Sequence, residues 1–140
     1  MWNNTSEPYG RAGNLIIDSD VLIWYLRGNE KAKKIIYSNI PFKISVVNYI
    51  ELIQGMRDKK ELRILQTHLK KWTTEIIQIN ENISSRAMFL VEDYHLSHSL
   101  GMADAIIAAT ALENQEILLT ANEKHYGFIP HLQIQKFRPK

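Results

Sequence analysis

Cysteine is absent from this 140-residue chain, which excludes disulfides and thiolate metal ligands. No apolar run approaches the roughly 18 residues of a membrane-spanning helix, and no apolar signal-peptide core stands at the start. The sequence therefore indicates neither membrane insertion nor secretion. We expect a cytoplasmic protein, a location with which the missing cysteine is compatible.

Apolar residues make up 45% of the chain, enough for one globular domain with a substantial core. We assign that single domain to residues 14–140. Residues 1–13 are polar, contain Gly and Pro and lack periodicity, which is typical of a mobile leader or a cloning remnant. The formal charge is +2. If four acids gather in one pocket, the remaining surface carries about +6 and could attract a polyanion.

Short apolar runs alternate with helical patterns from residue 14 onward. Buried strands are predicted at 15–18, 41–45, 75–79 and 116–120, and the alternating segment 132–137 is predicted as an edge strand. One helix is predicted to follow the first strand and run through Ile36, with others at 46–54, around 62–72, around 83–94 and at 102–113. Parallel strands need long crossover connections, so this order favours a three-layer α/β domain. Its central sheet is expected to be mostly parallel, with four or five strands and helices on both faces.

Two carboxylates, Asp18 and Asp20, follow the apolar run of the first strand. Helix capping and turn chemistry explain such a pair in many proteins. In open α/β sheets, the carboxyl ends of the strands are also where ligands bind, close to the positive N-termini of the following helices. The pair alone does not decide between these interpretations.

Further polar residues are predicted to reach the same edge of the sheet. Glu51 lies in the apolar segment VVNYIELI, where a buried carboxylate needs a partner or a cavity. Asp104 falls in the first turn of a helix rich in Ala and Ile, where it could also simply stabilise the helix. Thr120 ends the fourth strand, and Asn122 and Glu123 follow it.

Several carboxylates in one partly dry pocket repel each other, so they must take up protons or bind cations. Oxygen ligands without cysteine select hard ions such as Mg²⁺ or Mn²⁺. Such an ion can lower the pKa of a bound water and stabilise the attacking and leaving oxygens of a phosphodiester. The acidic cluster therefore suggests metal-assisted hydrolysis of a phosphate ester.

Four segments, taken together and in order, resemble a known family: IIDSDVLIWYLRGN, ISVVNYIELIQG, LGMADAIIAATALEN and LLTANEKHY. They look like the PIN-domain ribonucleases, most closely the VapC-type toxins of bacterial toxin–antitoxin pairs, over about residues 14–138. The resemblance implies a Mg²⁺- or Mn²⁺-dependent endoribonuclease acting on RNA. It also implies a homodimer held inactive by a small antitoxin that is encoded beside it.

The resemblance places Asp18, Glu51 and Asp104 as the catalytic acids. The same three residues are implied as metal ligands, Glu51 directly or through a water. Asp20 stands where the family often has Asn, which makes the first motif more acidic.

The segment after the fourth strand departs from the family pattern. Many PIN domains carry an acid there, whereas this chain has Asn122, which offers a neutral oxygen or a donor. Glu123 is the alternative fourth acid, so the number of metal ions, one or two, stays open. Thr120 is expected either to hydrogen-bond Asp18 or a ligand, or to be an ordinary strand end. His125 either touches RNA or is a surface residue.

Other functions stay open. The chain could be a housekeeping PIN nuclease without an antitoxin, or an interaction module whose site is degraded at Asn122. The DSD motif also resembles the start of haloacid-dehalogenase phosphatases, although Leu22 replaces their Thr or Val. His95 and His98 lack a third soft ligand, which argues against zinc. The sequence identifies neither the RNA target nor the residues that would contact it.

Overall fold

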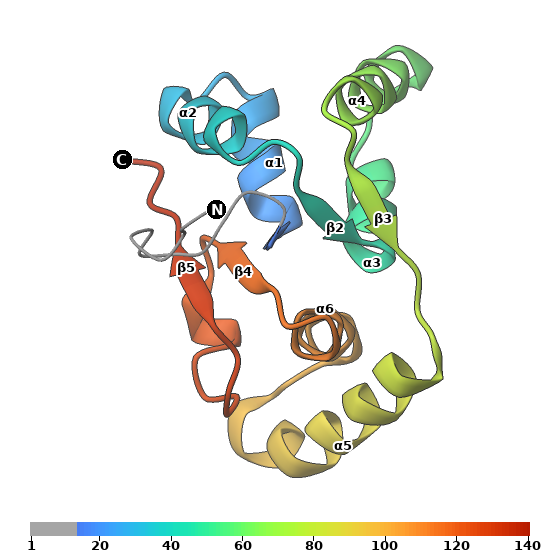
Figure 1. The fold of residues 1–140 in the computed structure, drawn as a ribbon, viewed down its shortest axis with the longest axis vertical. Coiled ribbons are helices and arrows are strands. Elements are labelled where there is room, and N and C mark those ends of the chain that lie inside the picture. The colour runs from blue at the N-terminus through green and yellow to red at the C-terminus, as the bar shows by residue number, and fades with distance from the viewer. Residues whose placement is uncertain (1–13) are drawn as a thin grey trace, which may run out of the picture.

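The computed structural model describes residues 14–140, which form a five-stranded sheet with helices on both faces (Figure 1). The strands are β1 (Leu15–Ile17), β2 (Lys43–Ser45), β3 (Glu75–Ile77), β4 (Ile117–Thr120) and β5 (Ile134–Lys136). Their order is β3-β2-β1-β4-β5, and every neighbouring pair is parallel. The predicted three-layer α/β class is confirmed, and the sheet is parallel throughout.

The central strand β1 divides the core into two layers. The helices are α1 (Ser19–Leu26), α2 (Glu30–Ser38), α3 (Val46–Gln54), α4 (Lys59–Lys71), α5 (Glu81–His98) and α6 (Met102–Glu113). Leu15 and Ile17 pack with buried side chains of α1, α2 and α4, and with Leu52 of α3. Ile16 points to the other face, where α5 and α6 cover the sheet. Alternate β1 residues thus anchor opposite helical layers, as expected for a strand buried on both faces.

The predicted bounds of α3 and α6 are confirmed, and 132–137 contains the edge strand β5. The prediction of one helix through Ile36 is wrong, because the chain forms α1 and α2 instead. Gly28 lies between them at φ +88°, a conformation that favours glycine. Asn29 then caps α2 by accepting a hydrogen bond from the Ala32 N–H. The predicted leader, 1–13, lies outside the described residues.

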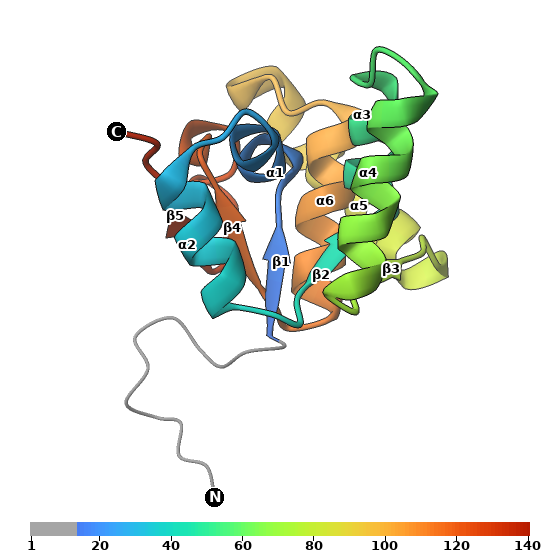
Figure 2. The ribbon, with the colours of Figure 1, turned by 90° about the horizontal axis from the view of Figure 1, so that it is seen from above.

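Two strand-to-helix junctions contain almost no loop and bring polar residues to one edge of the sheet. Asp18 is the single residue between β1 and α1, and Figure 2 shows β1 running directly into that helix. Ser45 ends β2 and caps α3 in a reciprocal capping box with Asn48. These short junctions fix the directions of α1 and α3 at the carboxyl edge of the sheet. Within residues 14–140, no helix has the length and apolar character needed to cross a membrane.

Candidate active site

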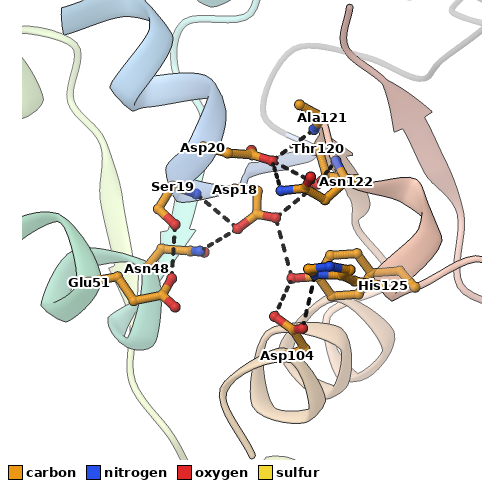
Figure 3. A network of polar contacts seen from close by, with 11 residues as sticks. Asp18, Ser19, Asp20, Asn48, Glu51, Asp104, Thr120, Ala121, Asn122 and His125 are labelled. Atoms are coloured by element: carbon orange, nitrogen blue, oxygen red, sulfur yellow. Dashed lines mark hydrogen bonds and ion pairs between the residues drawn. The ribbon is translucent and has the colours of Figure 1, made fainter. Parts of the chain in front are cut away.

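Asp18 is the centre of a polar network at the carboxyl edge of the sheet (Figure 3). It is 5% exposed and caps α1 by accepting from the Ser19 N–H at 2.9 Å. Its Oδ1 also accepts from Asn48 Nδ2 at 2.9 Å. Its Oδ2 accepts from Thr120 Oγ1 at 2.8 Å and from the Tyr126 hydroxyl at 3.3 Å. One side chain therefore both caps a helix and joins the acidic cluster.

Asp20, in the first turn of α1, faces the segment after β4. Its Oδ2 accepts from the Ala121 N–H at 3.0 Å and from Asn122 Nδ2 at 2.7 Å. Its Oδ1 is buried and has no hydrogen-bond donor among residues 14–140. Asn122 thus acts as a donor that orients Asp20, and one Asp20 oxygen is left without a partner.

Glu51 reaches the cluster from the second turn of α3. Its Oε1 accepts a 2.8 Å hydrogen bond from the Ser19 hydroxyl, and Figure 3 shows both side chains beside Asp18. Because the Ser19 N–H also donates to Asp18, one serine links two acids from different elements.

Asp104 approaches from the opposite side, in the first turn of α6 (Figure 3). Its Oδ1 accepts from the Tyr126 hydroxyl at 3.1 Å, and its Oδ2 lies 3.3 Å from His125 Nδ1. The Asp104 side chain is 31% exposed and that of His125 is 58% exposed. Asp104 and His125 therefore form the solvent-facing side of the cluster.

The electrostatics of the cluster favour protons or cations. Burial, and then the charge of Asp104, raise the pKa of Asp18 despite its hydrogen bonds. Burial and the charge of Asp18 raise the pKa of Asp20 to about 7. Burial also raises the pKa of Glu51. Among residues 14–140, no Lys or Arg forms an ion pair with any of these acids or with Asp104.

The donor set fits a hard divalent cation. Every acidic ligand candidate offers oxygen, and the unpartnered Oδ1 of Asp20 retains free acceptor capacity. Within residues 14–140, no three acidic or histidine side chains converge closely enough to hold an ion alone. Mg²⁺ commonly binds through one or two carboxylates and completes its coordination with water and phosphate oxygens. The arrangement matches that mode of binding.

Asn122 and Glu123, the two candidates for the fourth acidic position, have different partners. Asn122 donates to Asp20, as described above. Glu123 begins the short 3₁₀ helix η2 (Glu123–His125), and its Oε1 lies 3.1 Å from Arg138 Nη1 near the C-terminus. A hydrogen bond from its own backbone N–H, and then Arg138, lower the pKa of Glu123. The Glu123 carboxylate is therefore engaged by Arg138 in this structure.

Sequence reasoning did not select three residues of the network: Ser19, Asn48 and Tyr126. The S-x-x-N spacing of Ser45 and Asn48 signals a helix cap, but nothing local signals the contact between Asn48 and Asp18. Tyr126 resembles an ordinary core aromatic, and its ring is buried with residues of α5 and α6. Its hydroxyl meets Asp18 across 108 sequence positions, which no local pattern encodes.

An all-parallel α/β sheet whose carboxyl edge gathers acids that, within residues 14–140, have no Lys or Arg partner defines a domain suited to binding a cation and an anionic ligand. The family model described as PIN domain matches residues 15–128. The chain therefore belongs to the PIN domain family. This assignment removes the support for a haloacid-dehalogenase phosphatase, because the match includes the DSD motif.

Relatives of known name confirm the resemblance to the VapC branch. Ribonuclease VapC10 of Mycobacterium tuberculosis is 36% identical over 126 residues, which cover 85% of this chain and 90% of the relative. Ribonuclease VapC19 of the same organism is 30% identical over 125 residues, 84% of this chain and 96% of the relative.

Solved structures show the same fold. A toxin–antitoxin complex from Klebsiella pneumoniae contains a chain that superposes with a TM-score of 0.73 at 27% identity, covering 90% of this chain and 98% of that one. A chain of the DNA-bound VapBC complex from Salmonella typhimurium reaches a TM-score of 0.78 at 17% identity, covering 89% and 98%. The second likeness concerns the fold alone.

Proposed function

We propose that this chain is a Mg²⁺- or Mn²⁺-dependent endoribonuclease that hydrolyses RNA phosphodiester bonds as the toxin of a toxin–antitoxin pair. The observation that carries the proposal is that Ser19 and Tyr126 link Asp18, Glu51 and Asp104, from three separate elements, into one hydrogen-bond network, with no Lys or Arg paired to these acids within the described residues. The VapC relatives support the choice of RNA and of a partner antitoxin. We place the protein in the cytoplasm, as a homodimer.

Each acid has a role in this proposal. Asp18 is the rigid ligand, since four hydrogen bonds fix its carboxylate. Asp104 is the ligand that faces the RNA, because it is the partly exposed acid opposite Asp18. Glu51, held by Ser19, binds the ion directly or through a water. When bound, the cation supplies charge neutralisation and an activated water for attack on phosphorus.

The supporting residues orient these acids. Thr120 donates to Asp18, and Asn122 holds Asp20. The exposed ring of His125 lies beside Asp104, at the face where an RNA phosphate enters. Glu123 acts through its ion pair with Arg138, which fixes the segment that carries Asn122 and His125.

The decisive experiment measures RNA cleavage by purified protein with Mn²⁺. Asp104→Asn should lower cleavage at least about a hundredfold. Its thermal stability should stay equal or rise, because the change removes repulsion from Asp18. Glu113→Gln is the matched control on the same helix, since Glu113 pairs with Arg86 away from the cluster. Undiminished cleavage by Asp104→Asn would remove Asp104 from the mechanism, and an inactive wild type would favour a degraded interaction module.

A second experiment tests the toxin assignment. Expression of the chain alone should arrest growth, whereas co-expression with the product of the neighbouring small gene should yield a copurifying, inactive complex. Growth without arrest and without a copurifying partner would instead favour a housekeeping PIN nuclease.

A further inference from the structure

The Tyr126 hydroxyl bridges two acids that approach from opposite sides of the cluster, whereas the Thr120 hydroxyl, at 2.8 Å from Asp18 and 3.4 Å from Asp20, links two acids of one segment. The Tyr126 hydroxyl lies 3.3 Å from Asp18 Oδ2 and 3.1 Å from Asp104 Oδ1. A hydroxyl carries a single proton, so it donates fully to only one of these carboxylates at a time. Both distances exceed the 2.5–2.7 Å or so of a closed hydrogen bond from a hydroxyl to a carboxylate. The proton is shared, and neither acid is fully satisfied by it.

The other donors to Asp18 are held in place. A carboxylate offers about four lone-pair directions, and Asp18 has four donors. The Ser19 N–H belongs to the first residue of α1, and Asn48 is fixed by its capping box and is fully buried. The Thr120 hydroxyl approaches at 2.8 Å and is itself held by the Asn122 N–H at 3.0 Å. The contact from Tyr126 is the longest of the four, so it is the one that a cation displaces most readily.

The ring of Tyr126 is fixed in the core, so it cannot move toward either acid. The residue is 1% exposed and packs in the core layer beneath α5 and α6. Burial, together with the charges of Asp18 and Asp104, raises the pKa of the phenol, which therefore keeps its proton. The remaining freedom is rotation of the O–H bond, which selects either Asp18 or Asp104 as acceptor.

We infer that Tyr126 is a positioning residue that substitutes for the cation in the metal-free protein. Its hydroxyl bridges Asp18 and Asp104 in the metal-free protein. When a cation binds, the hydroxyl stops donating to Asp18, and the freed lone pair of Asp18 binds the cation. This inference rests on the metal dependence in the proposed function. The hydroxyl stabilises the metal-free cluster more than the metal-bound one, because a bound cation already relieves the repulsion between the acids. Tyr126 therefore sets the threshold of cation concentration at which the site fills.

The test compares Tyr126→Phe with the wild-type protein by calorimetric titration with Mn²⁺ and by thermal unfolding in chelator. The variant should bind Mn²⁺ about three- to tenfold more tightly, because the competing donor is gone. In chelator its melting temperature should fall, and the increase on adding Mn²⁺ should exceed that of the wild type. Tyr25→Phe is the matched control, since the Tyr25 hydroxyl meets only Tyr37 among the described residues, at 3.4 Å, and should change neither quantity.

Equal or weaker Mn²⁺ binding by folded Tyr126→Phe would overturn the inference while leaving the proposed function intact. A wild-type protein that binds no Mn²⁺ would overturn both. If the variant does not fold, wild-type protein carrying ¹³Cζ-labelled tyrosine is titrated with Mg²⁺. A tyrosine signal that shifts in proportion to site occupancy supports the reorientation, and a spectrum in which all the signals are unchanged rejects it.

Discussion

Buried carboxylates at the two ends of the parallel sheet differ in the charges that surround them. At the amino end, Glu116, which directly precedes β4, is 6% exposed and forms an ion pair with Lys43 of β2, on the other side of the central strand β1. At the carboxyl end, Asp18 is 5% exposed, its hydrogen-bond donors among the described residues are all neutral, and Asp20 and Asp104 lie close by. Similar burial is thus combined with opposite electrostatic surroundings.

This difference distinguishes a carboxylate that supports the fold from the carboxylates of the candidate active site. A buried carboxylate that only supports the fold is stabilised by a counter-ion from the chain itself, as Glu116 is. At the carboxyl end the chain supplies hydrogen-bond donors to orient its acids but, within residues 14–140, no Lys or Arg to neutralise them. The missing positive charge must come from protons or from a bound cation.

The largest effect is expected from a matched pair of substitutions at the two ends. Lys43→Met should lower the free energy of unfolding by about 3 kcal/mol, because it leaves Glu116 buried and unpaired. Asp18→Asn should change it by less than about 1 kcal/mol, because the hydroxyls of Thr120 and Tyr126 can turn and accept from the new amide. Urea unfolding in chelator measures both.

The control for this pair is Lys43→Met combined with Glu116→Leu, which removes the orphaned charge and should recover most of the loss. The contrast fails if Asp18→Asn destabilises the metal-free protein as much as Lys43→Met does.

A smaller effect is expected from pH. Asp20 has a pKa of about 7 in the folded protein against an ordinary value of 3.8, so the folded state binds more protons between these values. Stability should therefore decrease as pH rises from about 4 to about 7, and the raised pKa values of Asp18 and Glu51 act in the same direction. In chelator, the melting temperature should be about 3–6 °C higher near pH 5.5 than near pH 8.

Two comparisons sharpen the pH result. Mn²⁺ added near pH 8 should restore the lost stability, and Asp20→Asn should flatten the profile. Glu61 and Glu123 have pKa values below their ordinary value of 4.5, so they change the stability only at lower pH and not between pH 5.5 and 8. A melting temperature that rises between pH 5.5 and 8 without metal would contradict the proposed electrostatics.

The smallest effect concerns Asn122. Asn122→Asp replaces the 2.7 Å donor to Asp20 with a like charge, which should lower metal-free stability by about 1 kcal/mol near pH 8. The same added oxygen should tighten Mn²⁺ binding a few fold. Asn122→Ala removes the donor without adding charge, and it should share the loss of stability but not the gain in affinity. Calorimetry showing equal affinity for both variants would exclude residue 122 from the metal site.

Much of the fold was predictable because its signals are local. The apolar runs of β1 and β4 end at Asp18 and Thr120, and that pattern alone places both residues at one edge of a parallel sheet. The break between α1 and α2 was also signalled, since Gly28 and Asn29 form a helix stop followed by a helix cap. Apolar periodicity on both sides of this break led to the wrong prediction of one helix.

The contacts within the site were less predictable because they are distant in sequence. Glu123 and Asn122 are neighbours, and only the fold shows that one pairs with Arg138 while the other holds Asp20. The hydroxyl of Tyr126 gains its importance from two acids that no local pattern brings to it. Sequence reasoning identified the acids and the donors Thr120 and Asn122, but it omitted the donors Ser19, Asn48 and Tyr126.

The separation of these contacts along the chain has a consequence for protein synthesis. Asp18 is made early, but its partners Thr120 and Tyr126 follow 102 and 108 residues later. At about 5–20 residues per second, a ribosome needs several seconds to cover that interval. During this time β1 has no β4 beside it, and the acids cannot assume the arrangement described here. The acidic cluster is therefore incomplete until the second half of the chain has been translated.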